Sequence, residues 1–317
     1  MLSIINGGML STVQDLGRFG VMKDGFTQSG AMDQYSMKLA NALCGNEPNS
    51  PVIEMTALGI TARFTDEHIF CLCGGDFGAT LNGKPIERSR SYKASAGDIL
   101  TVGGARSGMR CCLAIAGGFA VPEVMGSAST NLKLGIGGYA GRKLRAGDIL
   151  PVGVPSSRAK AGMTAPVREF GGGCVRLRVI MGPQDDMFTE TDKALFLRQH
   201  YTATAGLDRM GLRLSGIALK GKNGTDIISD GIVFGSVQIT RSGMPIILAA
   251  DHQTTGGYAK IATVISVDLP LLAQVKPFDT LCFSAVSVRQ AERLAAKEKK
   301  FFDKILRLLG IYSFMYF

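Results

Sequence analysis

Hydrophobic residues along the chain recur in short runs that are rich in β-branched side chains and end at Gly, Pro, Asn or Asp. Such runs predict strands, because β-branched side chains pack well on a pleated sheet and the flanking residues favour turns. The predicted strands are VIEMT (52–56), GITARF (59–64), HIFCLC (68–73), RSYKAS (90–95), MRCCLAI (109–115), VRLRVIM (175–181), SVQIT (236–240), MPIILAA (244–250) and KIATVISV (260–267). Together with 41 glycines, they predict a mainly β protein of the barrel or sandwich kind.

Helical spacing of apolar residues appears in three places. Asp33 can N-cap a helix that runs through Leu39 and Leu43 and stops at Gly45. A short helix is expected near residues 191–197. The third runs from Ser287 to Arg307, where apolar residues alternate with basic ones as on an amphipathic helix.

One pattern repeats along the chain. AGDILTVG at residues 96–103 recurs as AGDILPVG at 146–153, and PFDTLCF at 277–283 is a looser third copy. A Gly or Phe before Asp, followed by alternating apolar residues, predicts a tight turn that leads into a short strand.

Residues 155–173 lose all periodicity and gather Ser, Pro, Gly and charged residues, which is typical of a linker. We therefore expect two β-rich domains, residues 1–154 and 174–317, with the predicted C-terminal helix in the second.

The net charge of +9 raises the question of nucleic-acid or membrane-surface binding. Residues 287–307 carry seven basic and three acidic side chains, so this helix supplies +4 of the total. A nucleic-acid surface would need aromatics interleaved with the basic residues, and the chain lacks Trp, so we favour a solvated face of an amphipathic helix over either kind of surface. No apolar run approaches bilayer length and no basic stretch precedes the first apolar residues, so we expect a cytoplasmic protein.

The seven cysteines are odd in number and mostly lie inside apolar runs such as IFCLC and RCCLAI. This pattern predicts reduced, buried thiols. Zinc ribbons need two C-x-x-C pairs or a nearby His, which these runs lack, so no metal site is predicted.

Nucleotide-binding motifs are weak. GIGGYA at residues 135–140 fits the dinucleotide fingerprint, but no strand precedes it and no helix follows it. The phosphate-loop pattern G-x-x-x-x-G-K-[ST] is missing, so any ATP chemistry must use other elements or another protein of a complex.

Polar side chains gather between glycines in six stretches, at residues 12–18, 28–33, 208–211, 229–231, 235–238 and 251–258. A carboxylate in a cleft can act as a general base and an Arg can clamp a carboxylate or phosphate, but the same residues also cap turns and form ion pairs. Asp251 and His252 are adjacent, and neighbouring side chains of an extended segment face opposite ways, which argues against a catalytic relay. The nucleophile elbow G-x-S-x-G is also missing.

Six motifs in order resemble the biotin-dependent carboxyltransferase family, also described as allophanate hydrolase subunit 2. They are GGMLSTVQDLGRFG (7–20), SGAMDQYSMKLAN (29–41), AGGFAVPEVMGSAST (116–130), GIGGYAGRKLRAGD (135–148), DRMGLRLSG (208–216) and DHQTTGGY (251–258). The VPEVMGSAST stretch and the chain length look most like the branch of that family formed by the C subunits of 5-oxoprolinase.

The resemblance implies two tandem cyclophilin-like β-barrels. It also implies a complex in which subunits A, B and C open 5-oxo-L-proline to L-glutamate with ATP. In that complex the ATP site can lie on a partner, and a composite site is shared with the B subunit. No biotinyl A-M-K-M motif occurs, so no biotin is expected on this chain.

The resemblance further implies site residues by motif position. The implied catalytic residues are Asp208, Asp251, Gln253 and Tyr258, with proton transfer at Asp251 or Asp208 and donation to the carbonyl oxygen by Gln253 and Tyr258. The implied substrate-binding residues, among which Arg18 or Arg209 binds the substrate carboxylate or phosphoryl group, are Gln14, Asp15, Arg18, Asp33, Arg209, Gln238, Gly256 and Gly257. Ala259 and Lys260 stand where the family usually has Pro and often Arg.

Two other activities within the family remain open. One is a carboxyltransferase that moves a carboxyl group from carboxybiotin on a separate carrier to urea or a related amide. The other is a regulatory protein, like family members that antagonise a histidine-kinase inhibitor in sporulating bacteria.

Overall fold

The computed structural model describes residues 1–171 and 173–308, which divide into two compact units. Unit 1 holds Met1–Arg18, Ser29–Phe170 and the end of the last helix from Lys300. Unit 2 holds Phe19–Gln28 and the described residues from Gly171 to Lys299.

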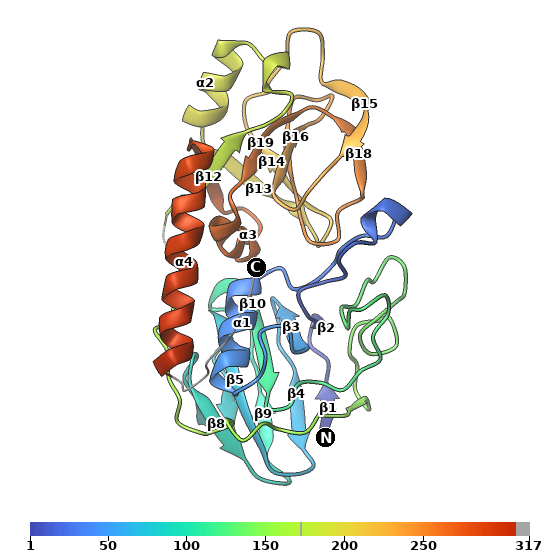
Figure 1. Cartoon of the computed structure of the whole chain (residues 1–317), viewed down its shortest axis with the longest axis vertical. Coiled ribbons are helices and arrows are strands. Elements are labelled where there is room, and N and C mark those ends of the chain that lie inside the picture. Colours follow the sequence, from blue (N-terminus) through green and yellow to red (C-terminus); the bar gives the residue numbers. More distant parts are fainter. Residues whose placement is uncertain (172, 309–317) are drawn as a thin grey trace. The chain divides into compact units, whose positions relative to one another are not determined.

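Unit 1 is built from antiparallel strands in two sheets (Figure 1). Their bounds are β1 Leu2–Asn6, β2 Leu10–Gln14, β3 Val52–Thr56, β4 Thr61–Phe64, β5 His68–Asp76, β6 Thr80–Leu81, β7 Lys84–Pro85, β8 Ser91–Ala94, β9 Ile99–Thr101, β10 Ser107–Ile115 and β11 Ile149–Leu150. One sheet has the order β11-β1-β4-β9-β6-β7 and the other β2-β3-β10-β5-β8. The two sheets share one hydrophobic core, to which β1, β3, β4, β5 and β10 all contribute.

The central strands β5 and β10 are buried on both faces. Phe70 and Leu72 of β5 face the core between the sheets, whereas Cys71 and Cys73 face helix α1, Gln34–Leu43. Because side chains alternate along a strand, the small thiols fill the space beneath this helix. All seven cysteines are free and all but Cys174 are buried, which confirms the prediction of reduced, mostly buried thiols.

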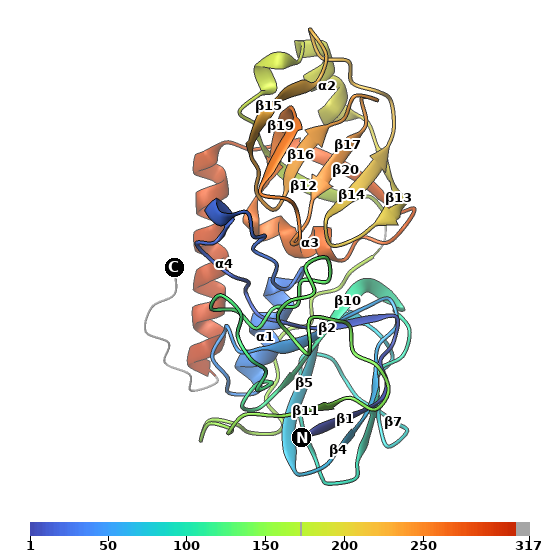
Figure 2. The same ribbon diagram turned by 90° about the vertical axis from the view of Figure 1, so that its right-hand side faces the viewer.

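Unit 2 is a closed barrel with the strand order β12-β19-β16-β17-β14-β13-β20 (Figure 2). Its strands are β12 Val175–Met181, β13 Tyr201–Leu207, β14 Gly211–Ser215, β16 Ser236–Ile239, β17 Pro245–Leu248, β19 Lys260–Val264 and β20 Thr280–Ala285. The pairing of β12 with β20 is parallel and closes the barrel. A separate two-stranded ribbon joins β15, Asp226–Gly231, to β18, Thr255–Tyr258. The mainly β prediction is confirmed.

The three predicted helices are confirmed. Helix α1 is N-capped by Asp33, whose side chain accepts from the Ser36 N–H, and Gly45 after it has a φ of 72°. Helix α2, Glu190–Arg198, starts with a capping box between Thr189 and Asp192. The structure adds a short helix α3, Leu269–Ala273, and α4 runs over Val288–Leu308. No helix among residues 1–171 and 173–308 is long and apolar enough to cross a membrane.

The repeated pattern forms the same turn three times. In each copy the Asp carboxylate accepts from the N–H of the residue three positions earlier, at 2.8 Å for Ser95 to Asp98, 2.9 Å for Arg145 to Asp148 and 2.8 Å for Lys276 to Asp279. The residue before the Asp has a left-handed backbone in every copy, with φ of 92° at Gly97, 89° at Gly147 and 71° at Phe278. The prediction of a tight turn leading into a strand is confirmed at all three sites.

The division into units differs from the predicted boundaries in three places. Residues 155–170, predicted as part of a linker, belong to unit 1, where Ala159 and Met163 pack on the core beneath α1. Phe19–Gln28 clusters with unit 2, and α4 is divided at Lys299. The linker composition reflects a coil that packs through a few apolar side chains rather than through periodic ones.

Candidate functional site

Asp15, which directly follows β2, is 2% exposed and organises the first motif. Its carboxylate accepts hydrogen bonds from the Gly17 N–H at 2.8 Å, the Ser127 hydroxyl at 2.7 Å and the Ala128 N–H at 2.7 Å, and from the Ser129 hydroxyl. Both carboxylate oxygens are therefore engaged, Oδ1 by three donors and Oδ2 by one. Asp15 therefore ties the VQDLGR motif to the GSAST segment, and direct substrate binding by this residue stays a prediction.

Arg18 is a fully buried side chain, 1% exposed. Its Nη2 donates to the Ser129 carbonyl, and a Cβ added at Gly137 would lie only 2.8 Å from the same nitrogen. The Ser129 carbonyl oxygen, 2.1 Å from such a Cβ, and the left-handed φ of 69° are the main reasons for glycine at position 137. The GIGGYA stretch that fits a nucleotide fingerprint serves here as packing for an arginine.

Gln14, on β2, is completely buried. Its Nε2 donates to the Thr12 hydroxyl at 2.9 Å and to the Thr130 carbonyl at 3.1 Å. Its Oε1 has no hydrogen-bond partner among the described residues. A buried amide oxygen without a partner is costly, so this atom is suited to accept a hydrogen bond from a bound molecule.

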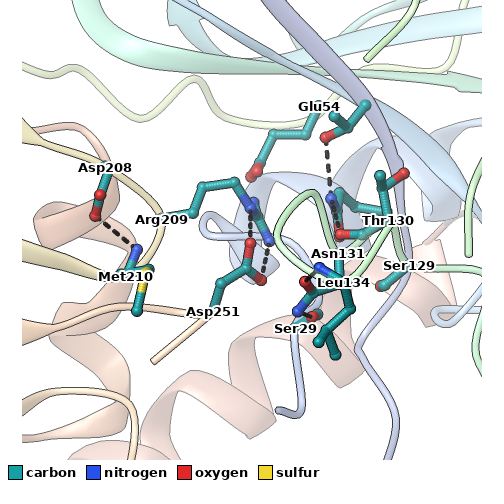
Figure 3. Close-up of polar contacts among 12 residues, drawn as sticks. Ser29, Glu54, Ser129, Thr130, Asn131, Leu134, Asp208, Arg209, Met210 and Asp251 are labelled. Atoms are coloured by element: carbon teal, nitrogen blue, oxygen red, sulfur yellow. Dashed lines mark hydrogen bonds and ion pairs between the residues drawn. The ribbon is translucent and has the colours of Figure 1, made fainter. Parts of the chain in front are cut away.

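Asp33 is also fully buried, and both of its carboxylate oxygens are engaged by Ser36, at 2.9 Å from the N–H and 2.7 Å from the hydroxyl. Its own N–H donates to the Glu54 carboxylate at 3.0 Å. Glu54 on β3 was not predicted as a site residue, although a Glu inside the apolar run VIEMT was a signal for it. Asn131, also not predicted, donates to the Ser29 hydroxyl at 3.1 Å and accepts from the Leu134 N–H at 2.9 Å (Figure 3).

In unit 2, Arg209 and Asp251 form a bidentate ion pair (Figure 3). Arg209 Nε and Nη2 lie 2.8 and 3.1 Å from the two Asp251 carboxylate oxygens, and the side chains are only 6% and 7% exposed. The motifs DRMG and DHQTTGGY therefore contact each other through Arg209 and Asp251. The two hydrogen bonds fix the guanidinium plane, and the carboxylate held by its Nε–Nη2 fork is that of Asp251.

Asp208 does not join this pair. Its Oδ1 accepts from the N–H groups of Met210 and Gly211 at 2.8 and 2.9 Å, so it caps the turn that precedes β14. Its proposed role in proton transfer remains a prediction.

His252 is buried and its Nδ1 contacts the carbonyl of Gln253. Burial lowers the pKa of His252 below its usual value, with the Gln253 carbonyl and the Asp251 charge opposing that effect. The ring is thus favoured in the neutral form. The structure agrees with the sequence argument against an Asp251–His252 relay, since Asp251 faces Arg209 instead.

Gln238 on β16 spans to the β18 ribbon, where its Nε2 donates to the Tyr258 carbonyl at 3.1 Å. A Cβ added at Gly256 would lie 2.5 Å from that nitrogen, whereas one at Gly257 would meet nothing closer than 3.5 Å. The space at Gly256 is taken by Gln238, so Gly256 has a structural reason to be glycine. Gln253 is exposed and the Tyr258 ring is partly exposed, and both can reach a bound molecule.

Lys260, which stands at the position where the family often has Arg, is 4% exposed and pairs with Asp230 of the ribbon. Its Nζ also donates to the Gly231 carbonyl at 2.9 Å. The ammonium therefore holds the β15–β18 ribbon to the barrel strand β19.

A cavity of about 520 Å³ lies in unit 1, and none of the predicted site residues lines it. Its charged lining consists of Asp76, Glu87, Arg88, Arg90, Arg106 and Glu169. Arg88 pairs with Glu169 at 3.0 Å and Arg90 with Glu87 at 3.2 Å, so most of its charge is internally balanced.

Comparison with known proteins gives a family for the whole chain. The model of the carboxyltransferase domain, subdomain A and B, matches residues 24–285. The 5-oxoprolinase C subunit of Haemophilus influenzae is 38% identical over 311 residues, which cover 98% of this chain and 99% of that protein. The Escherichia coli protein of the same name is 37% identical and covers 96% of this chain and 97% of its own length.

Larger proteins match as well. The urea amidolyase of Lachancea kluyveri is 32% identical over 92% of this chain, which spans only 17% of that protein. The crystal structure of the K. lactis urea amidolyase superimposes with a TM-score of 0.89 at 30% identity, over 96% of this chain and 20% of its own. These matches confirm the resemblance inferred from the six sequence motifs. With the family model covering most of its length, the chain belongs to the carboxyltransferase domain family, subdomain A and B.

Proposed function

We propose that this chain is the C subunit of an ATP-dependent 5-oxoprolinase, which opens 5-oxo-L-proline to L-glutamate together with subunits A and B. The observation that carries the proposal is the end-to-end match to two proteins named as C subunits of 5-oxoprolinase, at 38% and 37% identity. Because the match covers nearly the full length of both relatives, we assign this chain the same role in a multi-subunit enzyme.

The chemistry proposed for the complex begins with transfer of the terminal phosphoryl group of ATP to the lactam oxygen, which releases ADP. Water then adds to the activated carbon, and the C–N bond breaks as the nitrogen takes a proton. A second water releases phosphate from the resulting acyl phosphate and gives glutamate. Because the sequence has no phosphate-loop motif, we assign the ATP site to a partner protein of the complex.

Within this scheme, Arg209 is the proposed anchor for the substrate carboxylate or the phosphoryl group. Asp251 holds its guanidinium in one plane, which gives the positive charge of Arg209 a fixed position. The exposed Gln253 amide and the Tyr258 hydroxyl are proposed donors to the carbonyl oxygen, where negative charge develops. The unpartnered Gln14 Oε1 is a further proposed acceptor for a ligand N–H.

The direct test mixes the purified chain with its cognate A and B subunits and follows glutamate release from 5-oxo-L-proline with and without ATP. We expect glutamate only when all three subunits and ATP are present. A mixture with an Arg209→Ala chain should lose most of the activity, whereas Arg241→Ala, which removes an exposed arginine of the same unit, should retain it. A complete mixture that forms no glutamate would contradict the proposal.

A second candidate is a carboxyltransferase that acts on urea or a related amide. The structural match to the K. lactis urea amidolyase, with its TM-score of 0.89, favours it specifically. This activity requires carboxybiotin on a separate carrier, since the chain lacks the A-M-K-M motif. Urea-dependent consumption of carboxybiotin in the presence of this chain would support this candidate over the first.

A further inference from the structure

Three residues that are distant in sequence lie close together on one face of three neighbouring strands of the unit 2 barrel. Cys174 directly precedes β12, His200 directly precedes β13, and Cys282 lies in β20, the strand between them. Their sulfur and ring-nitrogen atoms all lie within 4.8 Å of one another.

The strand register explains the meeting. Arg176 pairs with Cys282, so Cys174, two residues before Arg176, lies on the same face of the sheet. On the other side of β20, Tyr201 of β13 pairs with Leu281. Because these two strands are antiparallel, His200, one residue before Tyr201, lies beside Cys282, one residue after Leu281. Leu281 and Tyr201 are fully buried, so the cysteines and the histidine occupy the opposite face.

The set has the chemistry of a soft-metal site. Two thiolates and a neutral imidazole are preferred ligands of Zn²⁺, and their charges balance the ion. Zn–S bonds of about 2.3 Å and Zn–N bonds of about 2.0 Å require ligand atoms roughly 3.5 Å apart in a tetrahedral site. Atoms already within 4.8 Å reach that spacing through side-chain rotation, and His200 is exposed and able to move.

Both cysteines of the set are free, so each can lose its proton and bind an ion. The five other cysteines lie buried in unit 1.

We propose that Cys174, His200 and Cys282 bind a soft divalent cation of the Zn²⁺ class, with the fourth position of the tetrahedron left to solvent or another ligand. The site is separate from Arg209 and Asp251, and it does not depend on the proposed 5-oxoprolinase function.

The test uses the full chain carrying an affinity tag free of histidine, reduced with a phosphine and stripped with a chelator. Co²⁺ is then titrated in, because cobalt–thiolate coordination produces a near-ultraviolet charge-transfer band and tetrahedral cobalt absorbs strongly in the visible. We expect saturation at one Co²⁺ per chain and displacement of the cobalt by Zn²⁺. Metal content of the chain purified without chelator, measured by mass spectrometry, gives a second readout.

Variants assign the ligands. Cys282→Ser should abolish the charge-transfer band, and His200→Ala should weaken binding by more than about 100-fold, because loss of even an outer-sphere partner costs 10- to 100-fold. The matched control His68→Gln removes a histidine of unit 1 and should bind cobalt like the unmodified chain. Circular dichroism of each stripped variant establishes that it is folded.

Three results would overturn the proposal. They are the lack of a cobalt–thiolate band in the reduced chain, a band that persists in a folded Cys174→Ser/Cys282→Ser chain, and equal weakening by His200→Ala and His68→Gln. If oxidation links Cys174 to Cys282 while the reduced chain takes up no metal, the pair is a disulfide and the proposal is wrong.

Discussion

At the scale of single residues, the ion pair of Arg209 with Asp251 changes how the two motifs are interpreted. The family resemblance implied anion binding at Arg18 or Arg209 and proton transfer at Asp251 or Asp208, as separate roles. In the structure the Arg209 guanidinium donates to both Asp251 carboxylate oxygens, at 2.8 and 3.1 Å, and both side chains are buried. A carboxylate that accepts two guanidinium N–H groups is better suited to position the arginine than to move protons.

This arrangement predicts the effect of Asp251→Asn in the reconstituted complex. Turnover should fall about 10- to 100-fold, equivalent to the roughly 1.5–3 kcal/mol of a charge-assisted hydrogen bond. The shape of the pH–rate profile should not change, because Asp251 is assigned no proton to carry. The measurement is the pH dependence of turnover for both chains.

The matched control is Asp226→Asn, which alters an exposed Asp–Arg pair of the same unit and should leave turnover unchanged. Loss of one limb of the pH–rate profile in Asp251→Asn alone would return the proton-transfer role to this residue.

Contacts between residues close in the sequence could be predicted, whereas contacts between residues far apart in the sequence could not. The N-cap at Asp33 was predictable, because its partner Ser36 is three residues away. The four hydrogen bonds of Asp15 were not, since most come from residues 127–129, more than 110 positions along the chain. Asn131 was missed for the same reason, since it donates to Ser29, 102 positions away, whereas the Glu inside the apolar run VIEMT was a local signal for Glu54. Polar residues between glycines predicted loops whose side chains form hydrogen bonds, but they did not predict which residues are the partners.

At the scale of elements, the three repeated turns were readable from sequence because their hydrogen bonds span only three residues. Closure of the barrel was not readable in that way. The parallel pairing of β12 with β20 joins Val175 to Leu281, and no local pattern encodes a contact over that separation.

The third turn carries a Phe where the other two have Gly. Phe278 has a φ of 71° and is 72% exposed, so it adopts a left-handed backbone and buries little in return. Phe278→Gly should raise the free energy of unfolding by about 0.5–1 kcal/mol, because relief of the roughly 1–2 kcal/mol left-handed penalty exceeds the entropic cost of glycine. Urea unfolding followed by circular dichroism measures it, since the chain has no Trp.

Phe278→Ala is the control for this prediction. It removes the ring but keeps the Cβ, so it should bring no gain. Equal stabilisation by Ala and Gly would show that the exposed ring, and not the backbone, was unfavourable.

The second turn predicts a pH dependence. Asp148 accepts two 2.8 Å hydrogen bonds from Arg142 as well as the Arg145 N–H, and the Arg142 contacts are the main cause that lowers the pKa of Asp148. The folded state therefore favours the ionised carboxylate. The stability it adds is complete above the unfolded pKa of about 4 and is lost as the pH falls through the lower folded value.

Asp148→Asn should accordingly lower the free energy of unfolding by about 1–2 kcal/mol at neutral pH, and the difference should close as the pH drops below about 4. Urea midpoints across that range provide the measurement. Asp98→Asn changes the copy of the turn that has Asn82 in place of the arginine, and it should show a smaller difference. A gap that stays constant down to low pH would exclude ionisation as its source.

At the scale of the whole molecule, composition and periodicity were sufficient to predict a mainly β chain. They could not predict that Phe19–Gln28 clusters with unit 2. Nor could they predict that α4 belongs to unit 2 up to Lys299 and to unit 1 from Lys300. Such exchanges depend on packing over long separations. The ligand set Cys174, His200 and Cys282 escaped detection for a related reason, since metal motifs are recognised by short spacings and these residues are brought together by register.

The relatives behind the two candidate functions differ in how much of their own length this chain covers. The chain matches C subunits of 5-oxoprolinase over 97–99% of their length but spans only 17% of a urea amidolyase, and it carries no biotinyl motif. The proposed lactam opening draws its energy from ATP and transfers no carboxyl group. Glutamate release by the reconstituted complex should therefore be unaffected by excess avidin, which sequesters biotin, and should not require bicarbonate. A biotin-dependent carboxylase assayed beside it under the same conditions should be fully inhibited by avidin. Inhibition of both would mean that carboxybiotin takes part, and the carboxyltransferase activity would then be favoured for this chain.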